Sequence, residues 1–136
     1  MEKAIALLKD NGLRKTQIRL NVLDTFLTSN QAYGQGDIEQ LHPNTDRISL
    51  YRTLKTFEDK GLIHQAIDGS GKTKYALCKH DCNEHKHFDH HAHFHCTDCK
   101  KTICLDSISV PEVQLPKNFT LQQSHLVLSG LCEDCQ

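Results

Sequence analysis

Two Cys-x-x-Cys pairs constrain this chain more than any other feature of its sequence. Cys96 and Cys99 form the first pair, and Cys132 and Cys135 form the second pair near the end of the chain. Each pair can place two thiolates on one tight turn, and two such turns complete the tetrahedron of a structural zinc site with cysteine ligands only. A site with four sulfur ligands leaves no open position for catalysis. Two disulfides, or reduced cysteines in a core, are the alternatives.

The cysteine count and the absence of targeting signals favour metal over disulfides. Seven cysteines is an odd number, and neither an N-terminal apolar leader nor an apolar run of membrane-spanning length is present. We therefore expect a cytoplasmic protein without a membrane partner. Thiols stay reduced in that compartment, where closely spaced cysteines are more often metal ligands.

Charge and histidine content divide the chain into two parts. Residues 1–77 carry 11 Lys and Arg against 9 Asp and Glu, whereas residues 78–136 carry 5 against 8 and most of the histidines. This asymmetry predicts a mildly basic module at 1–78 and an acidic, metal-binding module at 90–136. The hydrophilic, histidine-rich stretch at 79–89 would be a hinge, in which Cys82, His85 and His87 could chelate metal weakly.

The first module has the pattern of short helices followed by a β-hairpin. Thr16 and Ser49 are suited to cap helices, and Gly12 and Gly61 are suited to end them. Residues 29–36 are rich in turn formers and predict a loop. Apolar spacing and breakers predict four helices, at residues 2–10, 17–28, 37–41 and 50–60. The turn at 68–71, between residues 62–67 and 72–77, indicates a hairpin. This order predicts a winged helix-turn-helix.

The helix at 50–60 would enter the major groove of DNA in such a fold. Its polar residues form either an ordinary solvated face or a base-reading face, and an exposed tyrosine beside an arginine favours base reading. Three further basic residues are either phosphate contacts or plain solubilising charges. The predicted DNA-contacting residues are Ser49, Tyr51, Arg52, Lys55, Arg14, Lys15 and Arg19.

In the second module, residues 102–110 predict a strand and a turn, and residues 119–131 predict a strand that delivers Cys132. Pro111 and Pro116 lie too close together for a full helix between them. Residues 90–136 are too few to bury a stable core alone. Metal binding and a second subunit would have to supply the difference.

Six motifs, taken in order and spacing, resemble those of the ferric uptake regulator superfamily of bacterial metal-sensing repressors over nearly the whole chain. They are G-L-R-K-T-Q-I-R at 12–19, S-L-Y-R-T-L at 49–54, K-G-L-I-H at 60–64, K-Y-A-L-C at 74–78, H-H-A-H-F-H-C-T-D-C at 90–99 and S-G-L-C-E-D-C at 129–135. The resemblance implies an α+β fold, with an N-terminal winged helix and a small C-terminal α/β dimerisation domain. It also implies a homodimer that binds a palindromic operator when a regulatory metal is bound.

The resemblance further bears on which metal is sensed. The iron-sensing branch uses a histidine before the third helix and a glutamate near the end of the hairpin, but this chain has residues 31–33 without histidine, and Ala76. The zinc uptake branch uses a cysteine after the hairpin, a ligand after the recognition helix and the H-x-H strand. The matching residues are His64, Cys78, His91 and His93.

Ligand chemistry agrees with zinc, because alternating histidines on a strand share one face and a mixed sulfur and nitrogen set suits Zn²⁺. The alternatives are a surface histidine at His64 and a buried thiol at Cys78. Cys104 alternates with Ile103 and Leu105 and is expected on the non-core side of its strand. It lies where relatives often carry a metal-binding carboxylate, and it is an additional candidate ligand or a packed thiol. His95 is expected to border the structural site or to face solvent.

These observations predict a zinc-responsive DNA-binding repressor with one structural and one regulatory Zn²⁺. An iron- or nickel-responsive regulator, with Fe²⁺ or Ni²⁺ at the regulatory site, and a metal-buffering protein are the alternatives. We expect no enzyme activity, because no carboxylate accompanies the histidines in a general-base spacing such as H-E-x-x-H.

Overall fold

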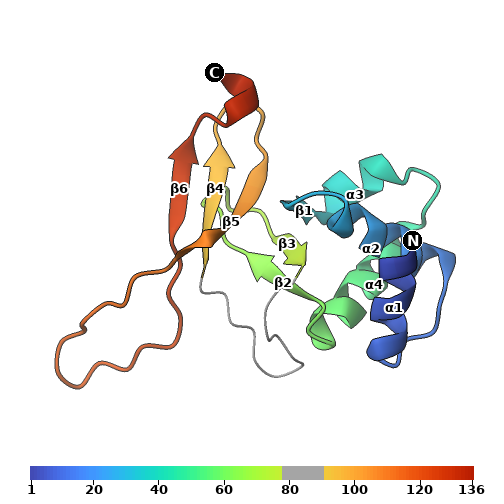
Figure 1. Cartoon of the computed structure of the whole chain (residues 1–136), viewed down its shortest axis with the longest axis horizontal. Coiled ribbons are helices and arrows are strands. Elements are labelled where there is room, and N and C mark those ends of the chain that lie inside the picture. Colours follow the sequence, from blue (N-terminus) through green and yellow to red (C-terminus); the bar gives the residue numbers. More distant parts are fainter. Residues whose placement is uncertain (78–90) are drawn as a thin grey trace.

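The computed structural model describes residues 1–77 and 91–136 (Figure 1). Cys78, the predicted hinge at 79–89 and His90 lie outside the described residues. The helices are α1 (Glu2–Asp10), α2 (Gln17–Leu27), α3 (Gln35–Leu41), α4 (Arg47–Asp59) and the 3-10 turn η1 (Glu133–Cys135). The strands are β1 (Gln31–Gly34), β2 (Ile63–Ala66), β3 (Lys74–Leu77), β4 (His91–Cys96), β5 (Thr102–Ser109) and β6 (Val127–Gly130). This is the expected α+β arrangement of a helical N-terminal part and a strand-rich C-terminal part. Among the described residues, no helix could span a membrane.

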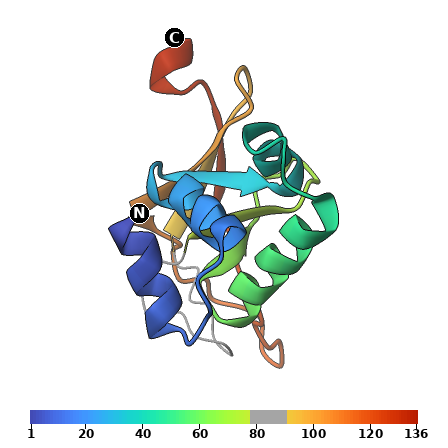
Figure 2. The same ribbon diagram turned by 90° about the vertical axis from the view of Figure 1, so that its right-hand side faces the viewer.

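The four α-helices form where the apolar spacing predicted them, and they pack around one hydrophobic core (Figure 2). Thr16 caps α2 by accepting a hydrogen bond from the Arg19 N–H at 3.4 Å, and Gly12 follows α1 with φ +67°. The buried core residues are Ala4, Leu8, Val22, Leu23, Phe26, Ile38, Leu50, Leu54, Phe57, Leu62, Ile63 and Tyr75. All of them precede residue 78, so this core needs no side chain from the C-terminal part.

The start of α4 differs from the prediction. The helix begins at Arg47 and is capped by Asp46, whose Oδ2 accepts hydrogen bonds from the Ser49 N–H at 3.0 Å and the Ser49 hydroxyl at 2.8 Å. Ser49 therefore lies within the helix and is not its cap. A carboxylate accepts these bonds more strongly than a hydroxyl and also complements the positive end of the helix dipole.

The predicted loop at 29–36 is also wrong, because residues Gln31–Gly34 form strand β1. One side of β1 pairs with β3, where Tyr33 is opposite Tyr75, and the other side pairs with β5, where Ala32 is opposite Thr102. The full sheet has the order β2-β3-β1-β5-β4-β6. A strand of the N-terminal part thus joins the hairpin to the C-terminal strands in one continuous sheet.

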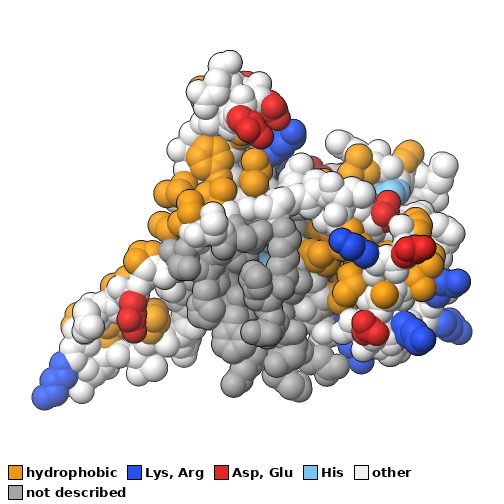
Figure 3. All heavy atoms as spheres, in the orientation of Figure 1, with side chains coloured by type: hydrophobic (Ala, Val, Ile, Leu, Met, Phe, Trp, Pro, Cys, Tyr) orange, Lys and Arg blue, Asp and Glu red, His pale blue; other side chains and the backbone are white. Residues whose placement is uncertain are grey.

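The C-terminal tail is less regular than predicted. The strand expected at 119–131 is reduced to β6, which pairs in parallel with β4. Residues 110–126 form an extended arm without a helix, as the close spacing of Pro111 and Pro116 predicted. The arm exposes Val113, Phe119 and Leu121 to solvent, and hydrophobic side chains continue from the arm onto the neighbouring strands (Figure 3).

Candidate metal centres

Two knuckle-like turns bring the four predicted cysteines together. Cys96 ends β4, and the turn after it is closed by the Lys100 N–H, which donates to the Cys96 carbonyl at 3.0 Å. Cys132 precedes η1, where the Cys135 N–H donates to the Cys132 carbonyl at 3.1 Å. The parallel pairing of β4 with β6 sets Cys96 opposite Gly130, which places the second turn beside the first.

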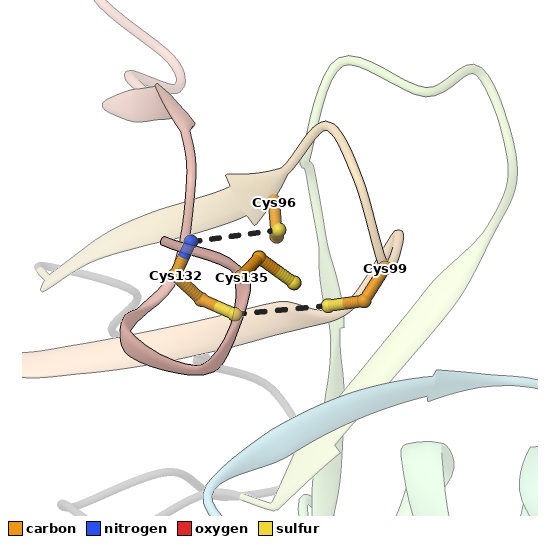
Figure 4. Close-up of side chains that lie close together, drawn as sticks. All are labelled: Cys96, Cys99, Cys132 and Cys135. Atoms are coloured by element: carbon orange, nitrogen blue, oxygen red, sulfur yellow. Dashed lines mark hydrogen bonds between the residues drawn. The ribbon is translucent and has the colours of Figure 1, made fainter.

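The four sulfurs converge in a way that fits a tetrahedral ion (Figure 4). All four Sγ atoms lie within 4.8 Å of one another, and the Cys99 and Cys132 Sγ atoms are 3.8 Å apart. Sulfur ligands at the usual Zn–S distance are separated by roughly 3.8 Å. This group of Cys96, Cys99, Cys132 and Cys135, which we call the cysteine cluster, can therefore hold a metal ion with little rearrangement.

The electrostatics of the cysteine cluster also favour a cation. The Cys132 N–H donates to the Cys96 Sγ at 3.5 Å and lowers the pKa of Cys96 to about 6. Hydrogen bonding with the Cys132 thiol and burial raise the pKa of Cys135. Its surroundings therefore stabilise the thiolate of Cys96 and the neutral thiol of Cys135. A divalent cation would allow all four to ionise.

Three of the remaining predicted ligands, His64, His93 and Cys104, lie on one face of the sheet. Residues paired in register point to the same side, as do residues two apart on a strand. We call this side the inner face. Its members on β1 to β5 are Ala32, His64, Ala66, Lys74, Ala76, His93, His95, Thr102 and Cys104.

The sheet curls strongly about this inner face. β2 and β4 are four strand positions apart, which in a flat sheet would separate them by roughly 19 Å. The ring centroids of His64 on β2 and His93 on β4 are nevertheless only 6.3 Å apart. Small side chains inside the curl, those of Ala32, Ala66 and Ala76, leave room for this approach.

His64 and His93 are both buried, at 5% and 1% exposure, so the alternative of a surface histidine at His64 is wrong. Two imidazoles on one tetrahedral zinc would have centroids roughly 5 Å apart, so the observed separation of 6.3 Å exceeds that of a shared site by only about an ångström. The backbone of His91 lies on β4. The side chain of His91 and the whole of Cys78 are outside the described residues.

Cys104 differs from its prediction. It was expected on the non-core side of its strand, but it is buried, packs with the small inner-face residues Ala32, Ala66 and Ala76, and lies opposite His93 in register. The reason is the curl of the sheet, which buries a face that would be open in a flat sheet. The location is compatible with both a packed thiol and a sulfur donor near the histidine pair.

A buried polar network next to the histidine pair was not predicted. Asp68, in the hairpin loop, accepts from Lys74 Nζ at 2.9 Å and from the Thr102 hydroxyl. Burial raises the pKa of Asp68, but hydrogen bonds from Ser70, Thr102 and Lys74 outweigh burial and hold this pKa well below its usual range. The sequence signal was a lysine at an inward position of a strand, which is rare without a buried partner.

His95 lies beside the same network. Its Nδ1 is 3.3 Å from the Thr102 hydroxyl oxygen and 3.6 Å from Asp68 Oδ2, and its side chain is partly exposed. Register explains this position, because His95 pairs with Thr102 on the inner face.

Most of the predicted DNA-contacting residues are exposed. On α4, Tyr51 and Arg52 are exposed, and Lys55 is half-buried with its Nζ 3.4 Å from Glu58 and 5.8 Å from the centre of the Tyr51 ring. Ser49 is exposed, but its hydroxyl is bonded to Asp46. Before α2, Arg14 and Lys15 are exposed, whereas Arg19 is half-buried and donates to the Arg14 carbonyl at 2.8 Å.

Comparison with known proteins gives a consistent result. The profile of the Ferric uptake regulator family matches residues 10–129. A ferric uptake regulation protein from Staphylococcus epidermidis is 33% identical over 140 residues, which cover 98% of this chain and 94% of that protein.

Solved structures share the fold at lower identity. A zinc-bound manganese uptake regulator aligns with a TM-score of 0.63 and 19% identity over 95% of this chain and 98% of that chain. A zinc uptake regulator complexed with zinc and DNA aligns with a TM-score of 0.60 and 19% identity, over 98% and 91%.

Proposed function

This chain belongs to the ferric uptake regulator family, and on that basis we propose that it is a zinc-responsive repressor that binds operator DNA as a homodimer. Members of this family are metal-responsive transcription regulators and not enzymes. The finer proposal names zinc as the sensed metal, the bacterial cytoplasm as the location and α4 as the helix that enters the major groove. It also divides the chain into a DNA-binding domain at 1–78, a hinge at 79–89 and a dimerisation and metal-binding domain at 90–136.

The observation that carries the choice of zinc is the donor set of the inner face. Two buried imidazoles, His64 and His93, approach each other, with the thiol of Cys104 opposite His93 in register. Residues 31–33 contain no histidine and Ala76 offers no carboxylate, although the resemblance places two ligands of an iron-type site there. Nitrogen and sulfur donors suit Zn²⁺ better than an oxygen-rich ion. We propose that Cys78 and His91 complete this regulatory site, and that the cysteine cluster holds a structural zinc.

The positions of the ligands explain how metal would control DNA binding. His64 lies on β2, which follows the recognition helix α4, and His93 lies on β4 next to the cysteine cluster. Zinc would supply a bond that joins these two parts. His64 would then fix the orientation of α4 relative to the C-terminal sheet, and in a homodimer two α4 helices would be spaced for successive major grooves, about 34–36 Å apart. By linkage, tighter zinc binding in that arrangement raises DNA affinity.

An iron-responsive regulator is the second candidate, because the S. epidermidis relative carries the name ferric uptake regulation protein. A metal-buffering protein, which would act through the histidine-rich stretch, would need no DNA-reading helix. Metal titration combined with a DNA-binding measurement distinguishes a zinc-responsive regulator, an iron-responsive regulator and a buffering protein.

The test measures metal content and DNA binding together. Protein purified without added metal is treated with a mild chelator, and an operator-like palindrome is titrated after Zn²⁺, Fe²⁺ or Ni²⁺ is restored. We expect one zinc per subunit to be lost and Zn²⁺ to restore binding. His93→Ala should keep the zinc of the cysteine cluster but lose zinc-dependent DNA binding, whereas His125→Ala, at an exposed histidine, should behave as the wild type. Restoration by Fe²⁺ or Ni²⁺ alone would refute zinc sensing, and no DNA binding with any metal would favour buffering.

A further inference from the structure

We propose that Asp68, Lys74 and Thr102 form a latch that holds the hairpin closed against the C-terminal sheet and thereby sets the distance between His64 and His93. The three residues come from different segments: Asp68 from the hairpin loop, Lys74 from β3 and Thr102 from β5. The inference rests on the proposed regulatory site, since it assigns to this network the positioning of two proposed ligands.

The hydrogen bonds of the latch form a closed triangle. Lys74 Nζ lies 2.9 Å from Asp68 Oδ2 and donates to Thr102 Oγ1 at 3.1 Å, while the Thr102 hydroxyl donates to the same Asp68 oxygen. All three residues are buried. The Ser70 N–H donates to the second Asp68 oxygen at 2.9 Å, which fixes the carboxylate within its own loop.

Lys74 also reaches the first turn of the cysteine cluster. Its Nζ donates to the carbonyl of Lys100 at 3.3 Å, and Lys100 directly follows Cys99. An ammonium group has three donors, and those of Lys74 are directed to the hairpin loop, to β5 and to this turn. The latch therefore connects the hairpin with the turn that would hold the structural metal.

The latch and the histidine pair are neighbours on the inner face, two residues apart along the same strands. In the hairpin, Ala66 pairs with Lys74 and His64 pairs with Ala76, two residues further along each strand. In the C-terminal part, His95 pairs with Thr102 and His93 pairs with Cys104, again two residues further. Both pairs of residues span the junction between the hairpin and the C-terminal strands. A change in the distance between Lys74 and Thr102 should therefore also change the distance between His64 and His93.

Among residues 1–77 and 91–136, strand pairing across this junction is short, which gives the latch its influence. β1 and β5 share only two register pairs in the described sheet, Gln31 with Ile103 and Ala32 with Thr102, supported by the Asn30 side chain, which donates to the Cys104 carbonyl at 2.6 Å. A buried ion pair adds little net stability, but its bonds define one geometry and make displaced arrangements unfavourable. We infer that it specifies the closed position of the hairpin.

The experiment measures zinc affinity of the second site in the full chain, with the zinc of the cysteine cluster retained, by competition with a chelator. Lys74→Met removes the charge at similar volume, and Lys72→Met, at an exposed lysine of the same hairpin, is its control. We expect Lys74→Met to weaken second-site zinc binding at least tenfold, with the first zinc and the helical circular dichroism unchanged. Lys72→Met should bind as the wild type. Equal affinity in both variants would overturn the latch.

A gentler pair of variants covers the case in which Lys74→Met does not fold. Thr102→Val removes the hydroxyl without changing the side-chain shape, and Thr102→Ser restores it. Weaker second-site binding in Thr102→Val that is regained in Thr102→Ser supports the latch, and equal binding in the two overturns it. His93→Ala serves as the reference variant. If His93→Ala keeps the second zinc, the proposed regulatory site is wrong. If His93→Ala loses the second zinc while the latch variants keep it, only the latch is wrong.

Discussion

In the helical part of this chain, large apolar side chains from all four α-helices and from the hairpin share one core, whereas residues 91–136 bury mainly alanine, cysteine, histidine and threonine. The same C-terminal part exposes large apolar residues, including Phe119 and Leu121. The helical part can fold by hydrophobic burial within one chain. The C-terminal part lacks that source of stability, so ligand bonds and a partner surface must replace it.

The largest effect should follow loss of one cysteine ligand. Cys96→Ser should abolish metal binding at the cysteine cluster and unfold residues 91–136, since zinc can contribute on the order of 10 kcal/mol to folding at such a site. Metal analysis, analytical ultracentrifugation and limited proteolysis would show a metal-depleted monomer with an intact helical part. Lys101→Gln, an exposed change just after the same turn, is the control. A metal-free variant that remains a DNA-binding dimer would show that the C-terminal part does not depend on its metal.

Two phenylalanines, one buried and one exposed, test whether hydrophobic burial stabilises the helical part. Phe57 is fully buried in α4, and Phe119 is 67% exposed on the arm. Phe57→Ala should lower the free energy of unfolding of the helical part by about 3–5 kcal/mol, and Phe119→Ala should change it by less than about 0.5 kcal/mol. Urea unfolding followed by circular dichroism measures both. Similar losses from the two variants would mean that the arm packs on the helical core in solution.

Substitutions at the proposed DNA-reading residues of α4 should weaken DNA binding without changing metal content or folding stability. Tyr51→Ala combined with Arg52→Ala should weaken operator binding by about 1–3 kcal/mol or more, as expected for lost base contacts, while metal content and unfolding stay unchanged. Fluorescence anisotropy with a labelled palindrome gives the affinity, and Lys117→Ala on the arm controls for the loss of one positive charge. Unchanged DNA affinity would remove α4 from the proposed interface.

The smallest effect concerns the cap of α4. Asp46→Ala should lower the unfolding temperature of the helical part slightly, because two hydrogen bonds at the helix N-terminus are lost. Asp46→Asn should retain most of this stability, since an amide oxygen can still accept from the Ser49 N–H. Thermal unfolding of the two variants provides the comparison, and equal midpoints would show that the carboxylate charge matters more than the hydrogen bond.

Sequence reasoning found the features that are encoded locally. Helical apolar spacing, the Gly12 and Gly61 helix ends and the two Cys-x-x-Cys pairs each act within a few residues, so the helices and the cysteine groups could be read directly. Strand β1 was missed because its four residues form a strand only through partners on β3 and β5. Asp68 was read correctly as a turn residue, but its second role depends on Lys74 and Thr102, which the sheet register brings to it.

The pairing of β1 has a consequence for synthesis of the chain on the ribosome. The Asn30 contact with Cys104 spans 74 residues, so the helical part and the hairpin can fold well before β5 emerges from the exit tunnel. During that interval one edge of β1 carries unpaired backbone groups, and an open strand edge is a template for association with other chains. Variants that slow the folding of residues 102–104 onto β1 should therefore reduce soluble yield even when the finished protein is stable.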